Sequence, residues 1–192
     1  LVARKALPPV VVADRAEIPD EWQFRQGHAQ GEFIGNQVIF LDNKSQGTRV
    51  GVHVIVPMRL KGNGNILLVN LGWLARPATY PTMPRRDVPA GLQTVDGMLV
   101  PPIKRFLELK NDTAQGNLWQ NLTIERARAQ LGQPVLPVIL HANPAGPGLE
   151  PVTELPDAGI DKHRGYAFQW YALATLVALL WLGLNLRKAR QS

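Results

Sequence analysis

Short apolar-rich segments separated by turn residues fill the chain between residues 21 and 100. Four of these segments are rich in β-branched, aromatic or alternating residues, and they run RQGHAQGEFI (25–34), NQVIFLDN (36–43), VGVHVIVPMRL (50–60) and NILLVNLGWLA (65–75). The stretch KGNGN (61–65) predicts a hairpin, because Gly and Asn supply the positive φ angles of tight turns. This part of the chain therefore predicts a meander of antiparallel strands.

The pattern changes after residue 75. The stretch RPATYPTMPRRDVPAG (76–91) contains four prolines and predicts an extended surface loop. Two further strands are predicted after it, at LQTVDGMLVP (92–101) and KRFLELK (104–110).

A short helix and a last strand are predicted next. TIERARAQLG (123–132) begins with a Thr at the N-cap position, carries an acid in its first turn and ends in Gly, which is typical of a helix. PVLPVILHAN (134–143) predicts a strand that lies at an edge of the sheet or starts one, since Pro137 cannot donate a hydrogen bond to a ladder.

The C-terminal part contains one long apolar run. From Tyr166 to Leu186 there are 21 residues without a charge. At about 1.5 Å per residue, a helix of that length spans roughly 32 Å, which is enough to cross a hydrocarbon core about 30 Å thick. Basic residues follow the run, so the pattern predicts a transmembrane helix over residues 161–187 with a cytoplasmic or matrix tail over 188–192.

These elements predict a fold class and a domain organisation. We expect an α+β membrane protein with an antiparallel β-rich extramembrane domain, a short helix and a C-terminal transmembrane helix. A first, N-terminal transmembrane helix is expected before Leu1, because the main domain needs a signal to reach the other side of the membrane. The expected parts are a linker (1–20), the β-rich periplasmic or intermembrane domain (21–143), a Pro/Gly-rich linker (144–160), the membrane helix (161–187) and the tail (188–192).

The charge distribution favours lipid over nucleic acid as a partner. The net charge is +6, of which +4 lies in residues 161–192 and only +2 in residues 1–160. Basic residues that flank an apolar run suit anionic lipid headgroups, whereas a nucleic-acid partner would need a basic stripe on the folded domain. We therefore expect contact with a lipid bilayer and no nucleic acid.

The residue types that carry chemistry are sparse. The chain has no Cys, which excludes disulfides, zinc ribbons and thiol nucleophiles. His28, His53 and His141 lie in or at the ends of predicted strands, and none has a second ligand at a metal-like spacing. An enzyme would need a polar constellation around these histidines that only folding could form, so no enzymatic activity is predicted.

His163 lies at the start of the apolar run, in DKHRGYAFQWYALA (161–174). On a helix, His163, Tyr166 and Trp170 share one face, which presents an imidazole above flat aromatic rings. A planar, metal-centred ligand such as haem is bound by this combination, with His as the axial ligand. The same residues are also typical of a basic collar on an aromatic belt at a membrane surface.

Several motifs resemble those of one family. DKHRGYAFQWYALA is similar to the Asn-x-His-x-x-Tyr-Ala-x-x-Trp signature of the Surfeit locus protein 1 family, the assembly factors of haem–copper cytochrome c oxidases. ILLVNLGWL (66–74) resembles the family's Leu-Val-Asn-Arg-Gly-Trp-Val strand, with Leu71 in place of Arg, and GNLWQNL (116–122) and EWQFRQGHAQGEF (21–33) resemble two further elements. The order of these motifs agrees over residues 21 to 186, and Asp161 replaces the signature Asn.

The resemblance implies a function, a cofactor and partners. It implies an assembly factor that helps deliver or insert haem a into the large subunit of cytochrome c oxidase, with transient haem contact at His163 as iron ligand and at Tyr166 and Trp170. The implied partners are the large subunit and other oxidase subunits or assembly factors. The implied location is the bacterial inner membrane with the main domain periplasmic, or alternatively the mitochondrial inner membrane.

A second hypothesis is an accessory or structural membrane subunit that stays in the oxidase or in a respiratory supercomplex. In that case the loop 76–91 and Gln169 would be contact surfaces.

Overall fold

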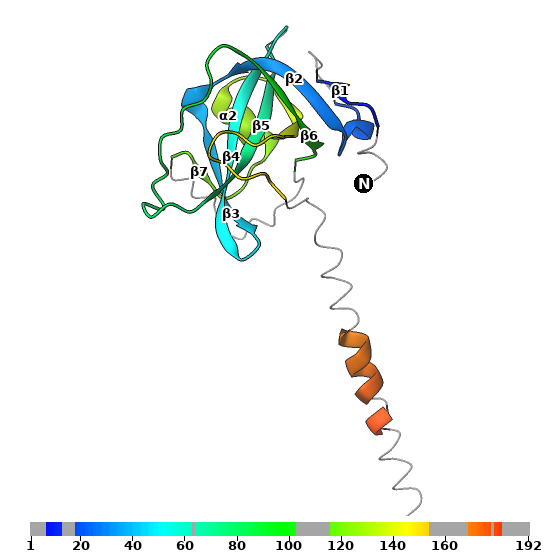
Figure 1. Cartoon of the computed structure of the whole chain (residues 1–192). Coiled ribbons are helices and arrows are strands. Elements are labelled where there is room, and N and C mark those ends of the chain that lie inside the picture. Colours follow the sequence, from blue (N-terminus) through cyan, green and yellow to red (C-terminus); the bar gives the residue numbers. More distant parts are fainter. Residues whose placement is uncertain are drawn as a thin grey trace, which may run out of the picture. The chain divides into compact units, whose positions relative to one another are not determined.

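A computed structural model of the chain describes residues 7–12, 18–62, 64–102, 116–153, 169–177 and 179–181 (Figure 1). Contacts divide the chain into two compact units, Leu1–Thr153 and Glu154–Ser192, and each is described by itself below.

The first unit is β-rich, with one short α-helix among its described residues. The elements are β1 (Val10–Val11), the 3-10 helix η1 (Asp20–Trp22), β2 (Gln26–Phe33), the 3-10 helix η2 (Gly35–Gln37), β3 (Ile39–Gln46), β4 (Arg49–Leu60), β5 (Ile66–Ala75), β6 (Leu92–Val100), β7 (Leu118–Trp119), α2 (Ile124–Leu131) and β8 (Val135–Ala142). The described strands form a single sheet in the order β1-β2-β6-β8-β5-β4-β3-β7.

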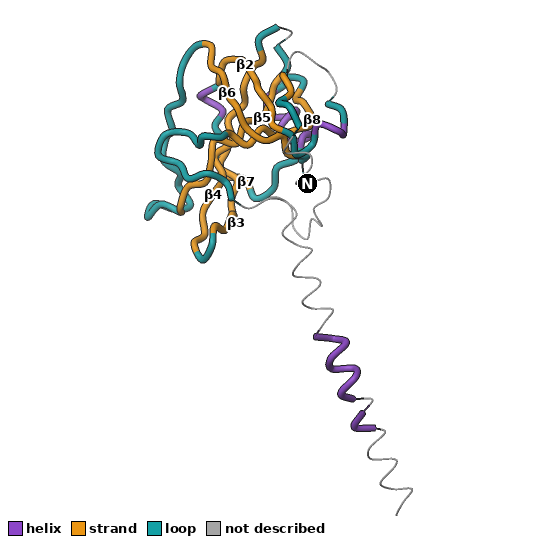
Figure 2. Tube along the Cα trace, turned by 45° about the vertical axis from the view of Figure 1, so that its right-hand side comes forward, coloured by secondary structure: helices purple, strands orange, loops and turns teal. Residues whose placement is uncertain are grey.

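The sheet closes on itself through β2, which pairs with β6 along most of its length and with β4 at its end (Figure 2). Gly31 lies at the crossing, where it is paired with both Gln93 and Leu60. A Cβ atom at Gly31 would lie 2.2 Å from the carbonyl oxygen of Arg59, so this close approach of two strands requires glycine.

Two apolar clusters lie on the two faces of the sheet. The interior cluster draws on every strand of the closed ring and includes Val54, Met58, Val69, Leu99 and Leu140. The outer cluster lies beneath α2 and includes Ile55, Leu68 and Ile139 from β4, β5 and β8, together with the helix residues Ile124, Ala127 and Leu131. Because successive residues of a strand face opposite sides, each of these three strands contributes to both clusters.

The helix predicted at 123–132 is confirmed. The Thr123 hydroxyl accepts a hydrogen bond from the backbone N–H of Arg126 at 3.2 Å, and Gly132 ends the helix in the left-handed conformation with φ of 62°. The hairpin at 61–65 is also confirmed, since β4 and β5 pair antiparallel on either side of it.

The arrangement of the strands differs from the predicted antiparallel meander. Three of the pairings among the described strands are parallel, namely β1 with β2, β3 with β7 and β5 with β8. The predicted edge position of the strand at 134–143 is wrong, because β8 lies between β5 and β6. Pro137 lies where the register between β5 and β8 shifts, between the pairs Ile66–Val135 and Leu68–Ile139. The ladder therefore needs no hydrogen-bond donor at this residue. The strand predicted at 104–110 lies outside the described residues.

The prediction of a C-terminal transmembrane helix is wrong, and with it the predicted fold class. In the second unit, residues 169–177 and 179–181 are helical. No helix of the described residues is long and apolar enough to cross a membrane. A span needs about 20 consecutive helical residues, and residues 161–168, 178 and 182–187 of the predicted span lie outside the described residues.

Candidate functional site

The predicted site residues near the C-terminus are described only in part. His163 and Tyr166 lie outside the described residues, whereas Trp170 lies on the helical stretch 169–177 and is 70% exposed. Trp170 and Trp181 lie towards the ends of an apolar groove of about 500 Å³, which is lined by Trp170, Leu173, Ala174, Val177 and Trp181. Their spacing of three, four, seven and eleven residues from Trp170 is the spacing of one helix face.

This helix face is suited to form one wall of a binding site for a planar apolar ligand such as haem. Its lining consists of indole rings and aliphatic side chains, and Leu173 and Val177 are more than half exposed. The residues that line the groove include no imidazole, and His163, the iron ligand predicted from the sequence, lies outside the described residues.

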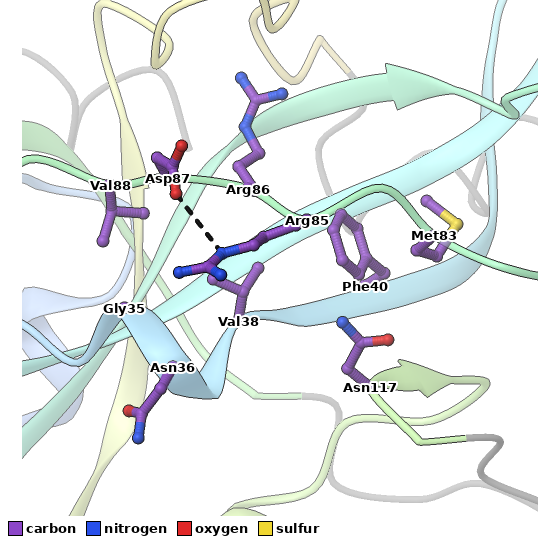
Figure 3. Close-up of a pocket in the computed structure, with 10 residues that line it drawn as sticks. All are labelled: Gly35, Asn36, Val38, Phe40, Met83, Arg85, Arg86, Asp87, Val88 and Asn117. Carbon is purple, nitrogen blue, oxygen red and sulfur yellow. Dashed lines mark ion pairs between the residues drawn. The ribbon is translucent and has the colours of Figure 1, made fainter.

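A second concave feature lies beneath the loop 76–91 (Figure 3). It is a cleft of about 650 Å³ lined by Gly35, Asn36, Val38, Phe40, Met83, Arg85, Arg86, Asp87, Val88 and Asn117. Figure 3 shows the loop residues from Met83 to Val88 running across Val38 and Phe40 of the β3 region. Arg85 and Asp87 form an exposed ion pair at 3.7 Å on the rim. The cleft thus combines an apolar floor with a charged edge, and its lining contains no histidine.

One end of this loop is held by a buried carboxylate. Asp42 is 3% exposed, and it accepts hydrogen bonds from the Tyr80 hydroxyl at 2.7 Å and from Nη2 of Arg76 at 2.9 Å. Burial acts to raise the pKa of Asp42, but the hydrogen bonds from Tyr80, the Asn43 backbone and Arg76 outweigh it and leave the pKa below 3.8. The guanidinium of Arg76 also lies 4.3 Å from the centre of the Tyr80 ring. The carboxylate, guanidinium and phenol therefore fix where the loop leaves the sheet.

A second point of the loop, Arg86, is held by the segment that follows β8. Nη2 of Arg86 donates a hydrogen bond to the Pro147 carbonyl, and Glu150 in the same segment pairs with Trp73 of β5. Glu150 also accepts two hydrogen bonds from Arg49, at 2.8 and 2.6 Å, which lower the pKa of its carboxyl. The loop that covers the cleft is thus held to the rest of the domain near its start and at Arg86.

Two of the histidines are brought together by the fold. His53 of β4 and His141 of β8 lie with ring centroids 6.2 Å apart and ring planes at 74°. Burial lowers the pKa of His53 to about 3 and that of His141 to about 4, with a further contribution from the Lys44 ammonium in both cases. Sequence reasoning missed this pair because β5 separates the two strands in the sheet, and no spacing in the chain signals it.

His28 lies apart from this pair. Its Nδ1 is 2.7 Å from a carboxylate oxygen of Asp96, directly across the β2–β6 ladder. It is therefore paired with an acid on its neighbouring strand.

Comparison with known proteins identifies the family of this fold. A sequence model described as the SURF1 family matches residues 2–175, which is most of the chain. The chain belongs to the SURF1 family. The resemblance to the Surfeit locus protein 1 family is thereby confirmed.

Two curated relatives of this SURF1 family chain are named SURF1-like protein. One, from Caenorhabditis elegans, is 27% identical over 137 residues, which cover 69% of this chain and 41% of the relative. The other, from Caenorhabditis briggsae, is 24% identical over 135 residues, which cover 69% of this chain and 42% of the relative. The aligned part of this SURF1 family chain thus spans about two fifths of the length of either relative.

Proposed function

We propose that this chain is a non-enzymatic assembly factor of a haem–copper cytochrome c oxidase. The observation that carries this proposal is the SURF1 family match over residues 2–175, which includes the β-rich unit and continues past Trp170. The cleft beneath the loop 76–91 supports a binding role, because an apolar floor with arginine on the rim is typical of a surface that docks a protein partner. The proposed partners are the large oxidase subunit and other oxidase subunits or assembly factors.

In its finer form, the proposal is that the protein assists the delivery or insertion of haem a. His163, Tyr166 and Trp170 are the proposed contacts, with the imidazole as ligand to the iron and the aromatic rings as walls. Bound haem a would supply the iron that accepts this ligand, while the chain would hold and orient the macrocycle. The exposed apolar face from Trp170 to Trp181 supports this assignment, since it offers flat apolar surface next to the signature.

The proposed location is the bacterial inner membrane with the main domain on the periplasmic side, or alternatively the mitochondrial inner membrane. The support is the row of exposed apolar side chains at residues 170–181, which requires an apolar partner such as a lipid bilayer or another protein.

The experiment is deletion of the gene for the complete protein, followed by reduced-minus-oxidised spectra of the membranes. We expect loss of the haem a band with the other haem bands intact, and recovery when the wild-type gene is returned. Return of a His163→Ala variant should leave the band reduced at least severalfold, whereas a His28→Ala variant should restore it, since His28 lies in the β-rich unit. A deletion strain with normal haem a would refute the assembly role, and full restoration by His163→Ala would refute the iron ligand alone.

The second candidate function is that of an accessory subunit retained in the oxidase or in a respiratory supercomplex. The anchored loop 76–91 favours it, because a fixed, exposed loop suits a permanent contact, and Gln169 is exposed as well. Purification of the mature oxidase separates the two roles. A stoichiometric amount of this chain in the active complex supports the subunit, and its absence supports the transient factor.

A further inference from the structure

Three neighbouring strands each place a polar side chain at the end of an apolar column on the outer face of the sheet. Ile55, Leu68 and Ile139 belong to the outer cluster beneath α2. Two residues further along that face, β4 has His53, β5 has Asn70 and β8 has His141. Asn70 and His141 are direct partners in the β5–β8 ladder, so their side chains are neighbours. The fold thus gathers two imidazoles and an amide from three separate stretches of sequence.

The separation of the two rings suits a shared ion. A transition-metal ion lies about 2.0–2.1 Å from each imidazole nitrogen, which holds two ring centroids about 5–6.5 Å apart for angles between tetrahedral and linear. The centroids of His53 and His141 lie 6.2 Å apart. The separation of the two rings therefore falls within the range that a shared ion would hold.

Histidine is the commonest metal ligand in proteins, and it binds a metal through a ring nitrogen that carries no proton. Within the part of the chain that the structure describes, neither ring forms a hydrogen bond to another side chain or to the backbone.

Asn70 supplies a second, independent observation. It is 1% exposed, its Oδ1 accepts a hydrogen bond from the Gly72 backbone N–H at 3.0 Å, and its Nδ2 has no partner. A buried amide donor without an acceptor costs about 1–3 kcal/mol, and a bound water or ion that accepts its hydrogen bond is one way in which a native structure offsets that cost. A water or hydroxide bound to an ion between the two rings would provide the missing acceptor.

We propose that His53 and His141 bind a transition-metal ion that prefers imidazole nitrogen, Cu²⁺ foremost, with Asn70 donating to a water ligand of that ion. This site is separate from the proposed haem contacts. The described residues contain no group of three or more His, Cys, Asp or Glu side chains that could hold a metal, so the chain supplies two protein ligands. The remaining positions are open to water or to a donor from a partner. Cu²⁺ is the divalent first-row ion that nitrogen ligands hold most tightly, followed by Ni²⁺ and Zn²⁺.

The test is titration of the chelator-treated 192-residue chain with Cu²⁺, followed by electron paramagnetic resonance and by calorimetry. We expect one ion per chain, with hyperfine splitting from two nitrogens, and weaker binding of Zn²⁺. His53→Gln and His141→Gln should each lower the affinity at least tenfold. His28→Gln is the matched control, since His28 lies on β2 with its Nδ1 paired to Asp96, and this variant should bind as the wild type does.

A gain-of-function variant keeps the proposal testable if the glutamine variants fold poorly. Asn70→Asp has nearly the same shape and adds a carboxylate ligand, so it should raise the Cu²⁺ affinity at least tenfold and increase the thermal shift produced by the ion. The proposal is wrong if the wild type shows no saturable binding, if folded His53→Gln and His141→Gln variants bind as tightly as the wild type, or if Asn70→Asp changes nothing.

Discussion

The hydroxyl of Tyr80 makes a measurable contribution to the stability of the domain through Asp42. The substitution Tyr80→Phe removes only the phenol oxygen, which donates to Oδ2 of Asp42 at 2.7 Å. The carboxylate then keeps its hydrogen bond from Arg76 at 2.9 Å on the other oxygen. Because Asp42 is 3% exposed, water cannot readily replace the lost donor.

The expected loss follows from this geometry. A hydrogen bond to a charged group contributes about 1.5–3 kcal/mol, and Tyr80 is itself 37% exposed, so we expect Tyr80→Phe to lower the free energy of unfolding by about 1–2 kcal/mol. Asp42→Asn should cost more, about 2–4 kcal/mol, because it leaves the half-buried Arg76 guanidinium without its counter-charge. In the Asp42→Asn background, Tyr80→Phe should then cost at least about 1 kcal/mol less than in the wild type.

The assay is a double-mutant cycle by urea unfolding at pH 7, followed by tryptophan fluorescence. Tyr171→Phe is the matched control, since Tyr171 is 75% exposed and its loss should change stability by less than about 0.5 kcal/mol. The pH gives a second check. The Tyr80 hydrogen bond lowers the pKa of Asp42, so the penalty of Tyr80→Phe should shrink as pH falls below 3.8 and the carboxylate becomes protonated. Equal penalties in both backgrounds would refute the assignment of this hydrogen bond.

Two further predictions concern the histidine pair and the strand crossing. In the presence of a chelator, the free energy of unfolding should fall by about 2–4 kcal/mol between pH 7 and pH 5, because His53 and His141 have pKa values of about 3 and 4 when folded and about 6.5 when unfolded. The two histidines of the unfolded chain take up protons first in this range, so the stability is full above pH 6.5 and declines towards pH 4. The double variant with Gln at both positions should lose this pH dependence, as measured by urea titrations. If the double variant keeps the same dependence of stability on pH, the assignment to His53 and His141 is wrong. Gly31→Ala should destabilise the domain by about 3 kcal/mol in thermal unfolding, since its Cβ would lie 2.2 Å from the Arg59 carbonyl oxygen. Gly47→Ala is the control, because Gly47 has open space around it and only its φ of 61° disfavours a side chain. This variant should cost about 1–2 kcal/mol. Equal losses at the two glycines would show that β2 and β4 can separate at the crossing without penalty.

The local elements of this chain followed from local sequence. The helix α2 could be predicted from Thr123 and Gly132, because a hydroxyl N-cap and a left-handed glycine act on groups within one turn of the helix. The β4–β5 hairpin followed in the same way from the Gly and Asn residues at 61–65, since a tight turn depends only on the backbone freedom of the residues within it. The family could also be recognised, because its motifs are short and lie in a fixed order.

The relations between elements could not be predicted in this way. The sequence pattern indicated an edge strand at Pro137, but β8 is central, because a register shift of the ladder removes the need for a donor there. It indicated a membrane helix from the 21-residue uncharged run and its basic flank, and no helix of the described residues is long and apolar enough to cross a membrane. It also left His53 and His141 as unrelated residues.

What the sequence by itself determined are the six longer strands β2, β3, β4, β5, β6 and β8, the turn, the helix with its two caps and the family, since these depend on residues that are neighbours along the chain. Only the tertiary structure decided that β2 closes the sheet at Gly31, that Asp42 holds the loop through Tyr80, and that two half-buried imidazoles from β4 and β8 lie edge to face. The physical reason is that strand order and register depend on how all the strands bury their apolar faces together. No single stretch of the chain carries that information.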